Sequence, residues 1–171
     1  NSIIAEEIKS NLKGLVSDDV IEIFKLNVIS PVHRTVALDC VTITLFEDDN
    51  KHKIKERIHL IGLFTSSVYY QSATLIPLIK DKINYVIKES GYDEISHHRK
   101  ELISIIESFP RDELLHISKE LLLEITIDTY HLQEQPNVKL FLRKHKIGNF
   151  YTCMVFLPKD KFSAALSEKI S

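Results

Sequence analysis

Glycine is scarce in this sequence, and its scarcity excludes the common phosphate-binding motifs. The 171 residues include four glycines, Gly14, Gly62, Gly91 and Gly148, which are spread along the whole chain. A dinucleotide-binding fingerprint and a P-loop both need glycines close together in sequence, so that the backbone can approach the phosphates. Neither motif is present, and we therefore expect no cofactor-binding residue in this chain.

Cysteine, net charge and long apolar runs are scarce as well. Cys40 and Cys153 stand far apart without the spacing of a metal site, and we expect both to be small buried residues. A net charge of −2 and a pI near 6.5 argue against nucleic acid or an anionic membrane as a partner. No apolar run approaches the roughly 18 residues of a membrane span. The first residues, NSIIAEEIKS, carry no secretion signal, so we expect a cytoplasmic location.

The apolar residues that are present follow patterns that predict an α+β fold. β-Branched and apolar residues dominate on both sides of the polar turn DDNK, which predicts an antiparallel hairpin over about 36–64. A second alternating pattern predicts another hairpin over about 138–157. Between the two hairpins, over about 75–133, the apolar residues recur with the period of a helix. The other expected elements are a helix over 3–13, a strand over 20–29 with a helix as the alternative, and a helix that starts near Lys159.

Prolines, serines and one glycine mark the expected ends of the helices. Pro77 suits a first helical turn and Gly91 a left-handed cap, while Ser96 and Ser118 suit N-caps. Pro110 and Pro136 are expected to end helices. The residues expected on the buried helical faces are Leu75, Ile79, Ile83, Val86, Ile87, Leu102, Ile103, Ile106 and Phe109.

The first hairpin shows a change of phase along its first strand. The apolar set moves from Val36, Leu38 and Cys40 to Val41, Ile43 and Leu45. A shift of one residue turns side chains to the opposite face of a sheet, unless a β-bulge restores the register. The pattern therefore predicts a bulge between Cys40 and Val41.

The stretch GLFTSSVYYQS, residues 62–72, is the first candidate functional site, because hydroxyl groups crowd there after a glycine, on Thr65, Ser66, Ser67, Tyr69 and Tyr70 and again on Ser72. Ser66 and Ser67 do not stand in a Gly-x-Ser-x-Gly elbow, which exposes a nucleophile on a strained turn. The alternative is that the hydroxyls from Thr65 to Ser72 satisfy backbone groups where a strand ends and a helix begins. We favour this capping role and predict no catalytic residue.

Histidines and acids supply further candidates, each with an ordinary structural explanation. His97 and His98 are adjacent, so on a helix their rings diverge by about 100° and do not readily share a metal. Asp112 and Glu113 would form an acid pair, but acids at a helix N-terminus also favour the helix dipole. We therefore predict no metal-binding residue and no catalytic carboxylate pair.

Basic residues gather in three places. His33-Arg34 would suit an anion, although an ion pair or a carbonyl contact is the expected role. The runs KHKIKER (51–57) and RKHK (143–146) lie at expected hairpin turns. Both runs are expected to form exposed polar faces.

Five motifs resemble one enzyme family. Their order and spacing over residues 30–165 are similar to those of the large NAD-specific glutamate dehydrogenases of bacteria, in the non-catalytic segment that precedes the catalytic domain. His116 departs from the pattern, which has a glutamine there, and residues 1–29 match only loosely. The motifs are SPVHR (30–34), GLFTSSVYYQS (62–72), FPRDELLHI (109–117), LQEQP (132–136) and RKHKIGNFYTCMVFLPKDKF (143–162).

The resemblance implies a segment of three parts. Residues 1–72 would be the end of a PAS-like or ACT-like β-module, 73–136 a helical connector, and 137–171 the truncated start of an ACT-like unit. The sequence begins at Asn1 rather than Met and ends inside a helical pattern, which also indicates a piece of a longer protein. The family's glutamate-binding and NAD-binding motifs have no counterpart here. NAD and the oxidative deamination of L-glutamate to 2-oxoglutarate and ammonia would therefore belong to the parent chain.

Two interpretations of the segment remain open at this point. In the first it is a regulatory and assembly region that binds an amino-acid effector and joins the subunits of a homo-oligomer. In the second it is an oligomerisation scaffold without a small-molecule ligand. Because an isolated hairpin is marginally stable, residues 138–157 are expected either to dock on the helices or to self-associate. The surface expected to do so is Phe150, Thr152, Met154 and Phe156.

Overall fold

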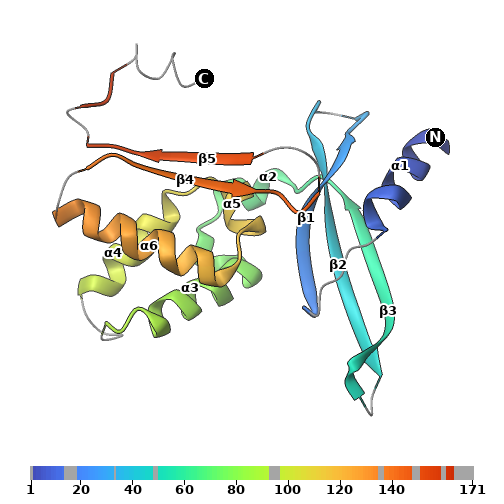
Figure 1. Cartoon of the computed structure of the whole chain (residues 1–171), viewed down its shortest axis with the longest axis horizontal. Coiled ribbons are helices and arrows are strands. Elements are labelled where there is room, and N and C mark those ends of the chain that lie inside the picture. Colours follow the sequence, from blue (N-terminus) through green and yellow to red (C-terminus); the bar gives the residue numbers. More distant parts are fainter. Residues whose placement is uncertain are drawn as a thin grey trace. The chain divides into compact units, whose positions relative to one another are not determined.

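The computed structural model of the chain describes residues 2–13, 19–32, 34–47, 50–92, 97–134, 137–147, 151–158 and 161–163. Its elements make an α+β fold, as the sequence predicts: a three-stranded antiparallel sheet, a helical segment and a two-stranded hairpin (Figure 1). The chain divides into two compact units, residues 1–70 with 144–150 and residues 71–143 with 151–171. No helix in the described ranges is long and apolar enough to cross a membrane.

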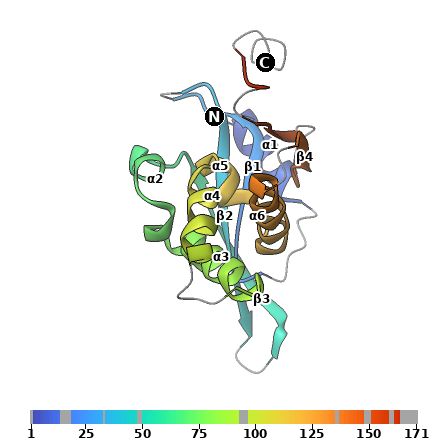
Figure 2. The same ribbon diagram turned by 90° about the vertical axis from the view of Figure 1, so that its left-hand side faces the viewer.

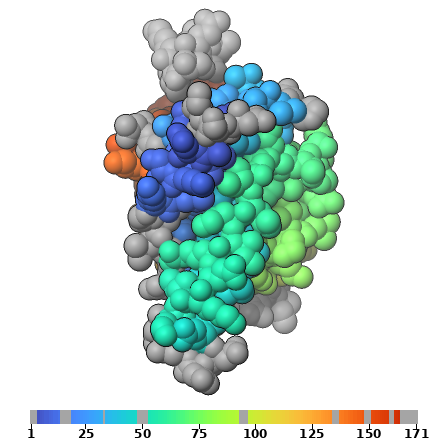
Figure 3. Space-filling model, turned by 90° about the vertical axis from the view of Figure 1, so that its right-hand side faces the viewer, coloured from blue at the N-terminus to red at the C-terminus, as the bar shows by residue number. Residues whose placement is uncertain are grey.

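The first unit is a sheet with one covering helix. Strands β1 (Ile21–Ile29), β2 (Ala37–Glu47) and β3 (Asn50–Gly62) are neighbours in that order and antiparallel. Helix α1 (Ser2–Leu12) packs on the sheet, and the short α2 (Ser66–Tyr70) follows it. Figure 3 shows α1 in blue and β3 in blue-green at the surface of this unit. The buried core consists of Phe24, Leu26, Val28, Leu38 and Cys40, with Ile4, Ile8 and Leu12 of α1 packed against it.

The predicted hairpin of β2 and β3 is confirmed, but the predicted bulge is wrong. From Asp39 to Leu45 the two strands pair without interruption, and their irregularities lie beyond Leu45. In the pairing of β1 with the start of β2, the register shifts between Lys25 and Ile29 of β1. The buried face of β2 continues through Thr42 and Thr44, because threonine is β-branched and suits a strand. The apolar residues at 41, 43 and 45 line the opposite face.

The second unit holds the helices and the second hairpin. Figure 2 shows α3, α4, α5 and α6 gathered together as one bundle. The strands β4 and β5 form a separate two-stranded sheet and run in opposite directions (Figure 1). The elements are η1 (Ala73–Leu75), α3 (Pro77–Glu89), α4 (His97–Glu107), α5 (Arg111–His116), α6 (Lys119–Glu134), β4 (Lys139–Lys144) and β5 (Tyr151–Phe156).

The helix ends follow the predicted signals. Pro77 lies in the first turn of α3, and Gly91 follows its end with a φ of 76°, in the left-handed region that favours glycine. The hydroxyl of Ser118 accepts a hydrogen bond from the Leu121 N–H at 3.2 Å and so caps α6. Pro110 occupies the N-cap position of α5. The predicted cap at 96 and the predicted stop at 136 lie outside the described residues.

The predicted helical core is confirmed except at two positions. Leu75 is 68% exposed, because it belongs to the 3₁₀ turn before Pro77 and not to α3. Ile103 is half-buried, and Ile105 takes the buried place on α4. The confirmed buried residues are Ile79, Ile83, Val86, Ile87, Leu102, Ile106 and Phe109.

The second hairpin lies against the helices of its own unit. Phe156 faces inward, and its ring centroid lies 5.9 Å from that of Phe109 and 5.5 Å from that of Phe141. Thr152 and Met154 are half-buried beside it. These contacts match the docking alternative of the sequence analysis. The predicted contribution of residue 150 and most of the helix expected from residue 159 lie outside the described residues.

Candidate functional site

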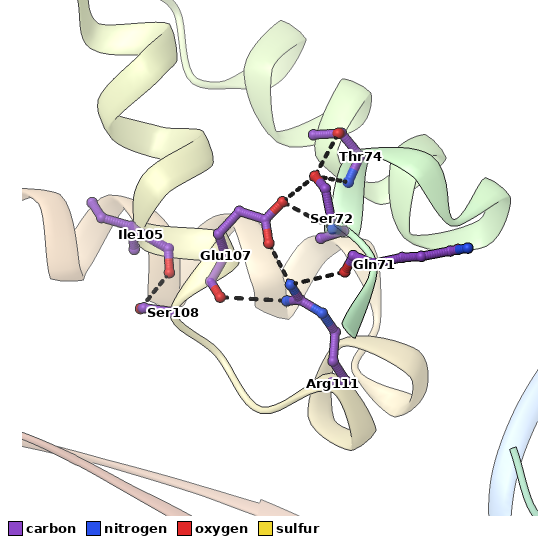
Figure 4. A network of polar contacts seen from close by, with 8 residues as sticks. Gln71, Ser72, Thr74, Ile105, Glu107, Ser108 and Arg111 are labelled. Carbon is purple, nitrogen blue, oxygen red and sulfur yellow. Dashed lines mark hydrogen bonds and ion pairs between the residues drawn. The ribbon is translucent and has the colours of Figure 1, made fainter. Parts of the chain in front are cut away.

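The end of the hydroxyl-rich stretch, at Gln71 and Ser72, is held by a cluster of polar contacts around Glu107 (Figure 4). The Glu107 carboxylate, at the end of α4, accepts hydrogen bonds from the Ser72 hydroxyl at 2.5 Å and the Ala73 N–H at 2.8 Å. Its second oxygen pairs with Arg111, whose guanidinium also donates to the Gln71 carbonyl at 3.4 Å. Ser72 in turn caps η1 by accepting from the Thr74 N–H at 3.3 Å. The capping role predicted for Ser72 is confirmed.

The charge of Glu107 is stabilised by these neighbours. Partial burial raises the pKa of the Glu107 carboxyl group, because desolvation penalises the charged form. The hydrogen bonds from Ser72 and Arg111, the Arg111 charge and the Ala73 N–H all lower it. The combined effect of these neighbours is larger than the effect of burial, so the pKa of Glu107 lies below its ordinary value of 4.5. The carboxylate therefore remains charged at neutral pH and acts as an anchor for the start of the helical segment.

We expect the Glu107→Gln variant to be less stable by on the order of 1–3 kcal/mol at pH 7, because an amide cannot replace a charged acceptor. The native pKa is depressed, so this contribution is present above pH 4.5 and is lost as pH falls through the native pKa. Urea unfolding at pH 7 and pH 3 measures both effects. Glu124→Gln, at an exposed position of α6, is the matched control and should change little. An equal deficit at both pH values would contradict the electrostatic explanation.

A second, more deeply buried cluster fastens the hairpin to the helices. Glu113 of α5 is 3% exposed and is paired with Arg143 of β4. Arg143 donates from Nε to Oε1 at 2.5 Å and from Nη2 to Oε2 at 2.8 Å. Such bidentate pairs fix orientation as well as distance. The pair therefore defines how β4 lies on α5.

A lysine completes this cluster from a third element. Lys82 of α3 donates from Nζ to the carbonyl oxygens of Leu114 and Leu115, at 2.8 and 2.9 Å, near the end of α5. Burial and the Arg143 charge lower the pKa of Lys82, Glu113 opposes both effects, and the resulting pKa is about 8. Arg143 thus joins β4 to the Glu113 carboxylate of α5, and Lys82 joins α3 to the α5 backbone next to it. We call the cluster of Lys82, Glu113 and Arg143 the Glu113 joint.

The acid and histidine candidates of the sequence analysis have other partners in the structure. Glu113 is used by Arg143, so it does not serve as half of an acid pair with Asp112. His97 Nδ1 lies 3.0 Å from Glu101 Oε1, whereas His98 Nδ1 lies 2.6 Å from the Tyr130 hydroxyl. In the part of the chain that the structure describes, no group of three histidine, cysteine or acidic residues could hold a metal ion.

Two expectations about exposure need correction. Cys40 is buried as predicted, but Cys153 is exposed, because it lies on the outward side of β5. The run at 143–146 is not simply an exposed polar face: Arg143 belongs to the Glu113 joint and His145 is 8% exposed. For Arg143 the physical reason is that the alternation along β4 turns this residue inward.

The remaining basic positions follow the predictions. Arg34 donates from Nη2 to the Phe64 carbonyl at 3.1 Å, which confirms a carbonyl contact, while position 33 lies outside the described residues. Lys53 is 66% exposed and pairs with Glu47 at 3.0 Å.

In the hydroxyl-rich stretch 62–72, the Thr65 and Ser67 hydroxyl groups form a hydrogen bond with each other at 2.7 Å.

Two family descriptions match this chain. One is the helical motif 1 of glutamate dehydrogenase, over residues 76–135, and the other is the ACT2 domain of glutamate dehydrogenase, over residues 139–171. The Glu113 joint therefore connects the two matched regions, with Lys82 and Glu113 in the first and Arg143 in the second. No solved structure matches the chain significantly.

The similar curated proteins are NAD-specific glutamate dehydrogenases. The protein of Pseudomonas aeruginosa is 36% identical over 82% of this chain, and that of Halomonas elongata is 33% identical over 81%. The protein of Mycobacterium tuberculosis is 28% identical over 62% of the chain. The chain spans only 8 to 9% of the length of the first two relatives. It therefore belongs to the family of large NAD-specific glutamate dehydrogenases, as a segment that carries their helical motif 1 and residues of their ACT2 domain.

Proposed function

We propose that this chain is a regulatory and assembly segment of a cytoplasmic NAD-specific glutamate dehydrogenase. The parent protein would convert L-glutamate to 2-oxoglutarate and ammonia with NAD, and would work as a homo-oligomer. The family matches support this proposal, since they fall on a helical motif and an ACT domain. The sequence also lacks the clustered glycines that a dinucleotide requires.

The observation that carries the proposal is the Glu113 joint. It connects β4 of the ACT2 hairpin to α5 through the buried Glu113 carboxylate, and Lys82 connects α5 to α3. A bidentate pair of this kind has one preferred geometry, so a shift of β4 has to be followed by α5 or the pair has to break. An amino-acid effector that moves the ACT2 region would thus change the helical motif as well. The segment would transmit the effector signal in this way.

Thermal unfolding of the chain with each L-amino acid tests the regulatory part of the proposal. A ligand that binds only the native state stabilises it, by about 2.7 kcal/mol when its concentration is 100 times the dissociation constant. We expect at least one amino acid to raise the melting temperature and its D-enantiomer to have no effect. If none of them does, the alternative of an oligomerisation scaffold without a ligand becomes the better explanation.

The chain alone is expected to have no dehydrogenase activity. It should neither produce NADH from L-glutamate nor bind NAD, because it carries no clustered glycines to approach a pyrophosphate. NADH absorbance and titration calorimetry with NAD are the two measurements, with an active glutamate dehydrogenase as the positive control. NADH production by protein that is free of full-length enzyme would contradict the proposal.

A further inference from the structure

The hairpin of β4 and β5 exposes several large apolar residues on its outer side. Along β4 the exposed positions alternate with the half-buried ones, and β5 begins with the same alternation. The exposed fractions are 54% for Val138, 53% for Leu140, 63% for Leu142 and 61% for Tyr151. These four residues and the exposed Cys153 are called the outer face.

The inner side of the same hairpin carries two basic residues beside the apolar side chains of Phe141 and Phe156. Arg143 is held by Glu113 there, and Lys139 forms an ion pair with Asp128 of α6. A hairpin with one side on a helical bundle normally turns its charged residues to water and its apolar residues to the bundle. In this hairpin apolar residues lie on both sides, and the large ones of the outer face remain in contact with solvent. Such a patch indicates a surface that binds another element.

The residues that follow β5 have a matching apolar pattern. Phe162, Leu166 and Ile170 are spaced by four, while Ser167, Glu168 and Lys169 lie between the last two. Residues spaced by four lie on one side of an α-helix. Eleven residues, 161–171, would span about 16 Å as a helix, and a six-residue strand spans about 20 Å. The segment is therefore long enough to cover most of the hairpin.

The described part of this segment already lies at the hairpin. Val155, Phe156, Leu157 and Phe162 together line a hollow of about 440 Å³ near the end of β5. Phe162 is nevertheless 61% exposed, so its ring still has apolar surface available. The chain thus passes close to β5 again after leaving it, although residues 164–171 lie outside the described ranges.

We propose that the outer face is the docking surface of residues 161–171 of this same chain, with the side chains of Phe162, Leu166 and Ile170 bound against it. The apolar side of the segment would cover the leucines of β4 and the thiol of Cys153. Its charged residues, Glu168 and Lys169, would remain in water. This contact is independent of any effector and goes beyond the regulatory function proposed above.

The native thiol of Cys153 provides a direct test. Cys40, the other free cysteine, is 0% exposed, so the reaction of folded protein with a thiol reagent reports on Cys153. We expect slow labelling of the unaltered chain at low protein concentration. Leu166→Glu should accelerate labelling on the order of tenfold by opening the covering segment. Ser167→Glu, on the polar side of the segment, is the matched control and should leave the rate unchanged.

Other outcomes of this experiment would overturn the proposal. Circular dichroism and the slow reaction of Cys40 verify that each variant remains folded. If the unaltered chain and Leu166→Glu label at the same fast rate, the outer face is open. If protection of Cys153 increases with protein concentration and sedimentation shows a dimer, a second copy covers the face instead.

Discussion

Replacing Glu113 by alanine is expected to lower the free energy of unfolding by about 3–5 kcal/mol. The variant leaves the Arg143 guanidinium, whose side chain is 14% exposed, without its carboxylate partner. It also removes the negative charge that opposes the effect of Arg143 on Lys82. Removing one partner of a buried pair is costly because the other remains desolvated and uncompensated. Urea denaturation at pH 7 measures the loss.

The control and the double variant make this expectation specific. Glu120→Ala, at a position where the side chain is 62% exposed, should cost less than about 0.5 kcal/mol. Arg143→Met combined with Glu113→Met should recover part of the loss, because no unpaired guanidinium remains. Equal costs for Glu113→Ala and Glu120→Ala would show that the Glu113 joint contributes no stability.

Replacing Ile106 by alanine is expected to cost on the order of 2–5 kcal/mol, and the same holds for Ile83→Ala. The two side chains are 0% and 2% exposed, on α4 and α3. Truncation removes buried methyl and methylene groups and leaves a cavity in a closely packed bundle. The measurement is again urea denaturation, with Lys80→Ala on the exposed side of α3 as the control. If the three variants cost the same, the buried face of the bundle has been assigned incorrectly.

The local features of this fold could be predicted from the sequence because their causes are local. The period of apolar residues predicts α3 and its buried Ile79 and Ile83. Gly91 and Ser118 lie where short-range backbone rules place them. The phase of β2 was predicted incorrectly, because threonine counts as polar in such a pattern although its shape suits a buried strand.

The polar contacts that organise the second unit could not be predicted in this way. Glu113 and Arg143 are 30 residues apart, and Ser72 and Glu107 are 35 apart. Composition does not indicate which acidic residue pairs with which basic residue, because the pairing depends on how the intervening helices and strands pack. A signal was present, however: Arg143 alternates with apolar residues in a strand, so one side of that strand had to bury either the charge or the leucines.

The ACT2 hairpin and the helical motif are expected to behave as one unit through the Glu113 joint. Hydrogen exchange of the backbone amides in β4, β5 and α5 tests it most directly, in the unaltered chain and in Glu113→Gln. We predict slow exchange in all three elements of the unaltered chain, and much faster exchange of β4 and α5 in the variant, with α3 still protected. A hairpin that exchanges at the rate of an unstructured peptide in the unaltered chain, or that is equally protected in the variant, would contradict this expectation.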